Sequence, residues 1–211
     1  MKILFLLYTQ AEGGAPGYLS RRGEEAAGNL AQTLFGFAQD TLQVNLDSEY
    51  EARTKSLQED LRWRAFRNPS SFPQAVRSAH SLFSDLLLVC GENFRTLKTA
   101  EPVSQMCALP VCVDARFDRC SDDLPRNGTL AEALQEFVEK HVVDVETTPR
   151  CVWVGTSQKA LKEWLKTVMD EQKWTECVQV LEQSTQNDLL PAVFACGYEK
   201  TADAAPRWII D

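Results

Sequence analysis

Apolar and polar positions follow two alternating periods along the chain. Short apolar runs, typical of buried strands, alternate with longer segments in which apolar residues recur every three or four positions, as on one face of a helix. The predicted strands are Lys2–Tyr8, Leu86–Cys90, Pro110–Val113, Cys151–Gly155, Pro191–Tyr198 and Arg207–Ile210. The predicted helix faces run from Ala26 to Leu34, from Leu130 to His141 and from Ala160 to Val168, the last capped by Ser157. This pattern predicts an α/β protein, a three-layer α/β/α sandwich with a mostly parallel central sheet.

A charged stretch from about residue 42 to residue 73 does not fit the alternation of strands and helices. Its weak helical seam consists of Tyr50, Leu57, Leu61 and Ala65. Trp63 and Phe66 fall off the seam. One interpretation is a surface helix that packs on its own domain, and the other is a helical insertion that presents Trp63 and Phe66 to a partner protein.

Length, charge and cysteine content limit the class of protein. With 211 residues and 44% apolar residues, we expect one domain spanning 1–211. The net charge of -8 argues against nucleic acid or an anionic membrane as a partner. No apolar run approaches the roughly 20 residues that cross a bilayer. Seven cysteines with scattered spacing suit a reducing compartment, so we expect an intracellular protein, cytoplasmic or nuclear, without a metal or cofactor.

Several blocks, in order, carry a more specific signal. These are the strand ending in Tyr8-Thr9-Gln10-Ala11, then Arg95-Thr-Leu-Lys-Thr-Ala100, Val113-Asp-Ala-Arg-Phe117, Asn127-Gly-Thr-Leu130 and Cys151-Val-Trp-Val-Gly-Thr156. Together they resemble the histidine phosphatase (phosphoglycerate mutase-like) superfamily, whose fold is the sandwich predicted above. A resemblance of this kind speaks for fold more than for activity.

The resemblance also implies where catalytic residues would lie. In that family one histidine attacks phosphorus, a second histidine and arginines bind the phosphoryl oxygens, and a carboxylic acid protonates the leaving group. The positions that depart from the family pattern are Tyr8, Thr9, Ala11, Arg119 and Thr156. Thr9 and Thr156 replace the two histidines, whereas Arg95 keeps the family's arginine.

A threonine hydroxyl is protonated at neutral pH and attacks only with the help of an adjacent base. His80 and His141 lie in segments that do not place them beside Thr9. In a comparable catalytic unit, losing the nucleophile alone costs about a million-fold in rate. We therefore expect a pseudophosphatase with no catalytic residues, serving as a structural or protein-interaction subunit of a larger complex.

Two other hypotheses remain open. Arg95 could bind a small phosphorylated ligand without cleaving it, which would make the protein a phospho-ligand sensor. Alternatively, Cys90, at the end of its strand, could act as a relocated nucleophile. Burial as a small apolar residue is the more common state of such a cysteine.

Overall fold

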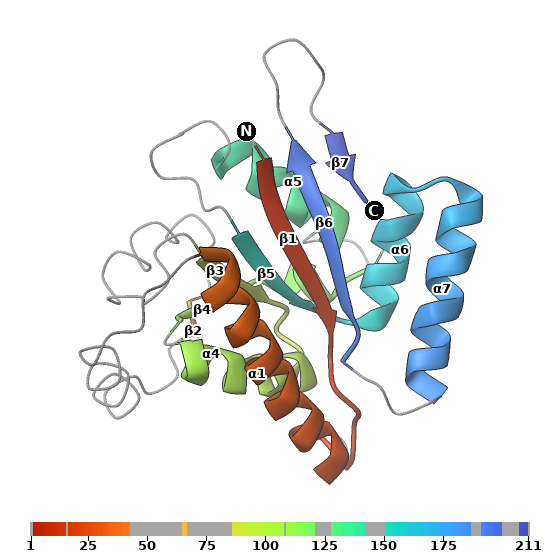
Figure 1. Cartoon of the computed structure of the whole chain (residues 1–211). Coiled ribbons are helices and arrows are strands. Elements are labelled where there is room, and N and C mark those ends of the chain that lie inside the picture. Colours follow the sequence, from red (N-terminus) through yellow and green to blue (C-terminus); the bar gives the residue numbers. More distant parts are fainter. Residues whose placement is uncertain are drawn as a thin grey trace.

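A seven-stranded sheet forms the middle of the computed structural model, which describes residues 2–15, 17–42, 65–66, 86–107, 109–120, 128–141, 151–186, 191–199 and 207–210 (Figure 1). The strands are β1 (Lys2–Thr9), β2 (Ala65–Phe66), β3 (Leu86–Cys90), β4 (Val111–Val113), β5 (Cys151–Thr156), β6 (Val193–Glu199) and β7 (Arg207–Ile209). Their order across the sheet is β2-β4-β3-β5-β1-β6-β7. All pairs from β2 to β1 are parallel, and β6 is antiparallel to both β1 and β7. The prediction of a mostly parallel sheet is confirmed.

Helices cover both faces of this sheet, which makes the three layers. The described helices are α1 (Arg21–Leu42), α4 (Phe94–Cys107), the 3₁₀ helix η2 (Ala115–Asp118), α5 (Leu130–His141), α6 (Gln158–Val168) and α7 (Glu171–Gln186). Helices α1 and α4 pack with one buried cluster of sheet residues, and α5 and α6 pack with the other (Figure 1). The predicted α/β/α sandwich is therefore present.

The first strand shows why these residues form a buried strand. Phe5 and Leu7 belong to the cluster under α5 and α6, whereas Leu6 and Tyr8 belong to the cluster under α1 and α4. Because successive side chains of a strand point to opposite faces, a strand between two helical layers needs apolar residues at both parities. The continuous apolar run at the start of the chain meets that requirement.

Two helices lie where apolar periodicity did not predict them. The buried face of α4 consists largely of small or polar side chains, among them Thr96, Thr99 and Ser104, which a search for apolar residues overlooks. Helix α7 is mostly exposed, and Leu181 is its buried position in the core. No helix in the described ranges combines the length and apolar character that crossing a bilayer requires. Ser157 caps α6 as predicted, accepting a hydrogen bond from the Ala160 amide.

The prediction for the stretch 42–73 is wrong at Ala65, which lies in a strand and not on a helical seam. Ala65 and Phe66 pair in parallel with Val111 and Cys112 and form the edge strand β2. A two-residue strand is too short to show a period of its own, so its partner strand decides its structure. The rest of the seam and the partner-surface candidate Trp63 lie outside the described residues.

Candidate functional site

The parallel strands β1, β3 and β5 end at one edge of the sheet, the edge where ligand sites of parallel α/β sheets lie. Thr9 at the end of β1 stands opposite Thr156 at the end of β5. Cys90 at the end of β3 stands opposite Gly155. The structure thus brings together Tyr8, Thr9 and Thr156, three of the positions at which the chain departs from the histidine phosphatase pattern.

Both threonine hydroxyls at this edge are bound to the backbone. The Ala192 amide donates to Thr9 Oγ1 at 3.0 Å, and Thr156 Oγ1 donates to the Phe117 carbonyl. Thr9 and Thr156 are each 0% exposed. Each hydroxyl therefore holds a loop against the sheet.

Replacing Thr156 by valine is expected to lower the free energy of unfolding by about 1–3 kcal/mol, because the buried Phe117 carbonyl loses its donor. Thr33→Val is the matched control, since the Thr33 hydroxyl also donates to a backbone carbonyl, that of Asn29, but is exposed. The control should change stability by about 0.5 kcal/mol or less. Urea unfolding of the three proteins measures the difference, and equal losses would show that the Thr156 hydroxyl has no structural role.

Tyr8 and Cys90 fill the space beneath these threonines. Burial raises the pKa of the Tyr8 hydroxyl and of the Cys90 thiol well above their ordinary values. Both side chains are 0% exposed, and a Cβ at Gly155 would lie 3.0 Å from the Cys90 Cβ and from the Tyr8 Oη. A nucleophilic cysteine needs a lowered pKa and some exposure, so this environment favours a packing role for Cys90.

Thr99 links Ala11, in the loop after β1, to Arg95 on α4. The Ala11 amide donates to Thr99 Oγ1 at 2.9 Å, and that hydroxyl donates to the Arg95 carbonyl at 2.8 Å. The Arg95 guanidinium lies against Gly13, where a Cβ would come within 2.6 Å of its Nη1. Of the described residues, none forms an ion pair with the Arg95 side chain. Arg95 is thus a cation against a backbone that only glycine lets it approach so closely.

Arg119 stands where the resemblance places a glutamate of the histidine phosphatases, and unlike Arg95 it lies beside acidic side chains. Its Nη2 lies 3.4 Å from a carboxylate oxygen of Glu92. Arg119 also lines a small cavity beside Trp164 and Glu163, on the α5 and α6 side. These contacts give the guanidinium acidic neighbours on its own protein.

Asp118 is the group at this edge that sequence reasoning missed. Its two carboxylate oxygens accept hydrogen bonds from the Asn93 amide at 2.8 Å and the Thr96 hydroxyl at 2.9 Å. Burial raises its pKa to about 6, although both hydrogen bonds favour the charged form. A pKa near neutrality is typical of a general acid, but here both oxygens join η2 to the start of α4. The sequence signal available was an aspartate five residues beyond the strand that ends at Val113.

The described residues hold no group of three or more His, Cys, Asp or Glu side chains that could bind a metal ion. The His141 side chain and the whole of His80 lie outside the described residues.

Several solved structures of phosphatases and related hydrolases are similar to this chain over almost its whole length. No protein-family model matches the chain, and no curated protein matches it either. A mycobacterial glucosyl-3-phosphoglycerate phosphatase is 12% identical with a TM-score of 0.47, covering 100% of this chain and 96% of its own. The solved structure titled mycobacterial hydrolase 2 is 12% identical with a TM-score of 0.49, covering 100% and 88%. The product of a Mycobacterium tuberculosis open reading frame is 14% identical with a TM-score of 0.40, covering 99% and 96%. Identities and TM-scores this low support no inference about activity.

Proposed function

We propose that this chain is a histidine phosphatase-like domain without phosphoryl-transfer activity that serves as a protein-interaction subunit. The sequence blocks around Thr9, Arg95 and Thr156 support the relationship to that superfamily. The observation that carries the proposal is the state of the two threonine hydroxyls, which are buried and hydrogen-bonded to the backbone of Ala192 and Phe117.

A nucleophile must reach phosphorus and needs positive charge around the phosphoryl oxygens. Thr9 offers neither an exposed oxygen nor a neighbouring base among the described residues. Tyr8 replaces the family's cationic neighbour with a buried aromatic ring. The same substitutions suit a folded core, because they exchange polar catalytic groups for side chains that are packed or hydrogen-bonded within it.

Hydrolysis of a generic phosphomonoester tests the absence of activity. The purified protein should show no turnover above buffer, and Thr9→Val should behave identically, since the hydroxyl plays no part in chemistry. Turnover in the wild type that Thr9→Val or Thr156→Val abolishes would overturn the proposal.

A second candidate function rests on Arg95, whose guanidinium has no ion-pair partner among the described residues. An arginine in this state suits a phosphoryl group, which a guanidinium binds through two parallel hydrogen bonds. Inorganic phosphate should then raise the melting temperature of the wild type but not of Arg95→Gln. Arg21→Gln is the control, because Arg21 is exposed and pairs with Glu25. A shift that Arg95→Gln retains would exclude this function.

A further inference from the structure

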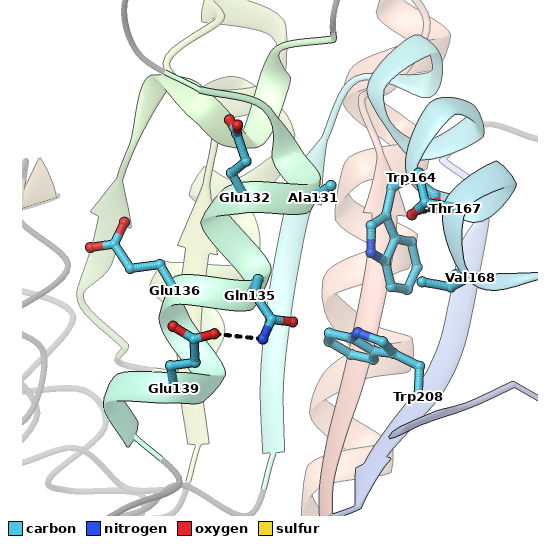
Figure 2. Close-up of a pocket in the computed structure, with 9 residues that line it drawn as sticks. All are labelled: Ala131, Glu132, Gln135, Glu136, Glu139, Trp164, Thr167, Val168 and Trp208. Carbon is cyan, nitrogen blue, oxygen red and sulfur yellow. Dashed lines mark hydrogen bonds between the residues drawn. The ribbon is translucent and has the colours of Figure 1, made fainter. Parts of the chain in front are cut away.

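A groove of about 490 Å³ runs between α5 and α6 on the face opposite α1. Figure 2 shows its two walls, with the α5 side chains on one side and Trp164, Val168 and Trp208 on the other. The remaining lining residues are Ala131, Glu132, Gln135, Glu136, Glu139 and Thr167. The groove therefore has one acidic wall and one aromatic wall, and none of the described residues that line it is a lysine or an arginine.

Two of the three carboxylates of the acidic wall have no ion-pair partner among the described residues. Glu136 forms an ion pair with Arg116, whereas the Glu132 carboxylate accepts a hydrogen bond from the Thr129 amide and the Glu139 carboxylate accepts one from Gln135 Nε2. The Glu132 carboxylate folds back over the start of α5, where it and the Arg116 stem both lie against Gly128, so Glu139 is the less compensated of the two charges. These two residues are seven positions apart on α5, which spaces them by about 10 Å along the helix axis.

The aromatic wall offers a flat face and an unused donor. Trp208 packs edge-on against Trp164, with 5.1 Å between ring centroids, and against Phe5 at 5.0 Å, which fixes its orientation. Trp164 is only 2% exposed, and its indole nitrogen points into the groove in Figure 2. Among the described residues, the hydrogen bond that Trp164 makes is through its backbone carbonyl, which accepts from the Thr167 hydroxyl, and none uses the indole nitrogen. The nitrogen is not one of the buried polar atoms without a partner, so it reaches the surface of the groove, where an acceptor of a bound segment can take its hydrogen bond.

Gln135 adds an acceptor between the walls. Its Nε2 donates to Glu139 at 2.7 Å, so its Oε1 remains as an acceptor, and Figure 2 shows the side chain extending from α5 toward the two indoles. A planar cation that donates in several directions matches this arrangement. A guanidinium can stack on an indole face while it donates to a carboxylate and an amide oxygen at its edge.

We propose that the groove between α5 and α6 binds an arginine-bearing basic segment of a partner protein. One guanidinium stacks on Trp208 and donates to Gln135 and Glu139, a second basic side chain pairs with Glu132, and a backbone carbonyl of the segment accepts from the Trp164 indole. The proposal names the partner class for the interaction subunit proposed above, and in that respect it rests on that function.

Charge decides between this occupant and the alternatives. A second copy of a chain with a net charge of -8 is repelled by an acidic wall, and so is a nucleic acid. A lysine ammonium satisfies the carboxylates but lacks the planar face that stacks on indole and the fork that bonds two acceptors. An arginine segment uses the carboxylates, the indole face and the Trp164 donor together.

A fluorescein-labelled peptide, Gly-Arg-Ser-Ala-Ser-Arg-Gly, is the probe. Its arginines are four residues apart, so in an extended chain both side chains lie on one face, about 13 Å apart, and their flexible stems span the distance between Glu132 and Glu139. Fluorescence anisotropy with the full chain should show saturable binding, several-fold tighter than for the same peptide with lysines. Glu139→Lys should weaken binding about tenfold or more, because the variant places a like charge against the guanidinium.

Glu176→Lys is the matched control, because Glu176 also accepts from a glutamine one helical turn earlier, Gln172, but lies on α7 away from the groove. It should weaken binding less than about twofold. Equal losses in both variants, or no binding at about 1 mM peptide, would overturn the proposal. If the protein is a dimer in solution and Glu139→Lys dissociates it, the groove binds a second copy of the chain, which would also overturn the proposal. Phosphatase activity in a protein that still binds the peptide would refute the proposed lack of activity and leave the groove assignment intact.

Discussion

Gly91→Ala is expected to lower the free energy of unfolding by about 3–5 kcal/mol, the combined cost of overpacking and of displacing a hydrogen-bonded carboxylate. A Cβ at position 91 would lie 1.9 Å from the Asp118 carboxyl carbon, so Asp118 would have to leave the Asn93 amide and the Thr96 hydroxyl. Gly91 is itself held in place, because its amide donates to the Gly155 carbonyl at 3.0 Å. Urea unfolding measures the loss.

A double-mutant cycle assigns this loss to Asp118. In an Asp118→Ala background, where the carboxyl is gone, Gly91→Ala should cost about 1 kcal/mol or less. Gly36→Ala is the control substitution, since a Cβ there meets nothing within 4 Å and alanine favours the helix. That variant should gain about 0.5–1 kcal/mol. A full loss for Gly91→Ala in the absence of the Asp118 carboxyl would place the strain elsewhere.

The second large effect is the dependence of stability on pH through Asp118. Burial raises the pKa of Asp118 to about 6 in the folded protein, whereas an unfolded aspartate titrates near 3.9. Between these values the folded state binds more protons than the unfolded state, so the contribution is full below about pH 4 and is lost as pH rises through 6. Each unit of pKa corresponds to about 1.4 kcal/mol, which makes the loss about 3 kcal/mol.

Asp118→Asn removes the titration while keeping an oxygen for the Asn93 amide. Its stability relative to wild type should therefore rise by about 3 kcal/mol between pH 4 and pH 7. Unfolding midpoints in urea across that range measure the difference. Asp170→Asn is the control, because the exposed Asp170 also accepts a backbone N–H, that of Lys173. A constant difference between wild type and Asp118→Asn would mean that Asp118 titrates as it does in the unfolded chain.

The strands could be predicted because their signal is local. Leu86–Cys90 is an apolar run whose five residues are all buried, and the structure has the strand at those bounds. Helix α5 was predicted for the same reason, since its apolar face is continuous. Strand β2 could not be predicted, because two residues form a strand only where the edge of β4 is free to pair with them.

The candidate site also has one part that could be predicted from the sequence and one part that could not. The threonines at positions 9 and 156 are visible in the sequence, and the parallel register of β1 and β5 follows from the fold. What their hydroxyls bind could not be predicted, because Ala192 and Phe117 are distant in the chain and reach the threonines only through tertiary packing. Asp118 was missed for the same physical reason, since its burial depends on η2 closing over Gly91 and α4.

The groove between α5 and α6 could not be predicted from the sequence at all. Its acidic residues on α5 look like an ordinary solvated helix face in the sequence, and Trp208 looks like one apolar residue of the last strand. Only the antiparallel pairing of β7 with β6 brings Trp208 beside Trp164 and opposite Glu139. A site assembled from three distant segments has no local sequence signal.

The most direct test of the central claim is a search for a covalent phosphoryl-protein intermediate. The protein is incubated with a reactive phosphoryl donor, quenched at alkaline pH and examined by intact-protein mass spectrometry and peptide mapping. No phosphorylated protein is expected, because Thr9 and Thr156 are buried and hydrogen-bonded to the backbone and Cys90 is buried with a raised pKa. A phosphoryl group found on Thr9, Thr156 or Cys90, formed and lost at the rate of substrate turnover, would contradict the central claim.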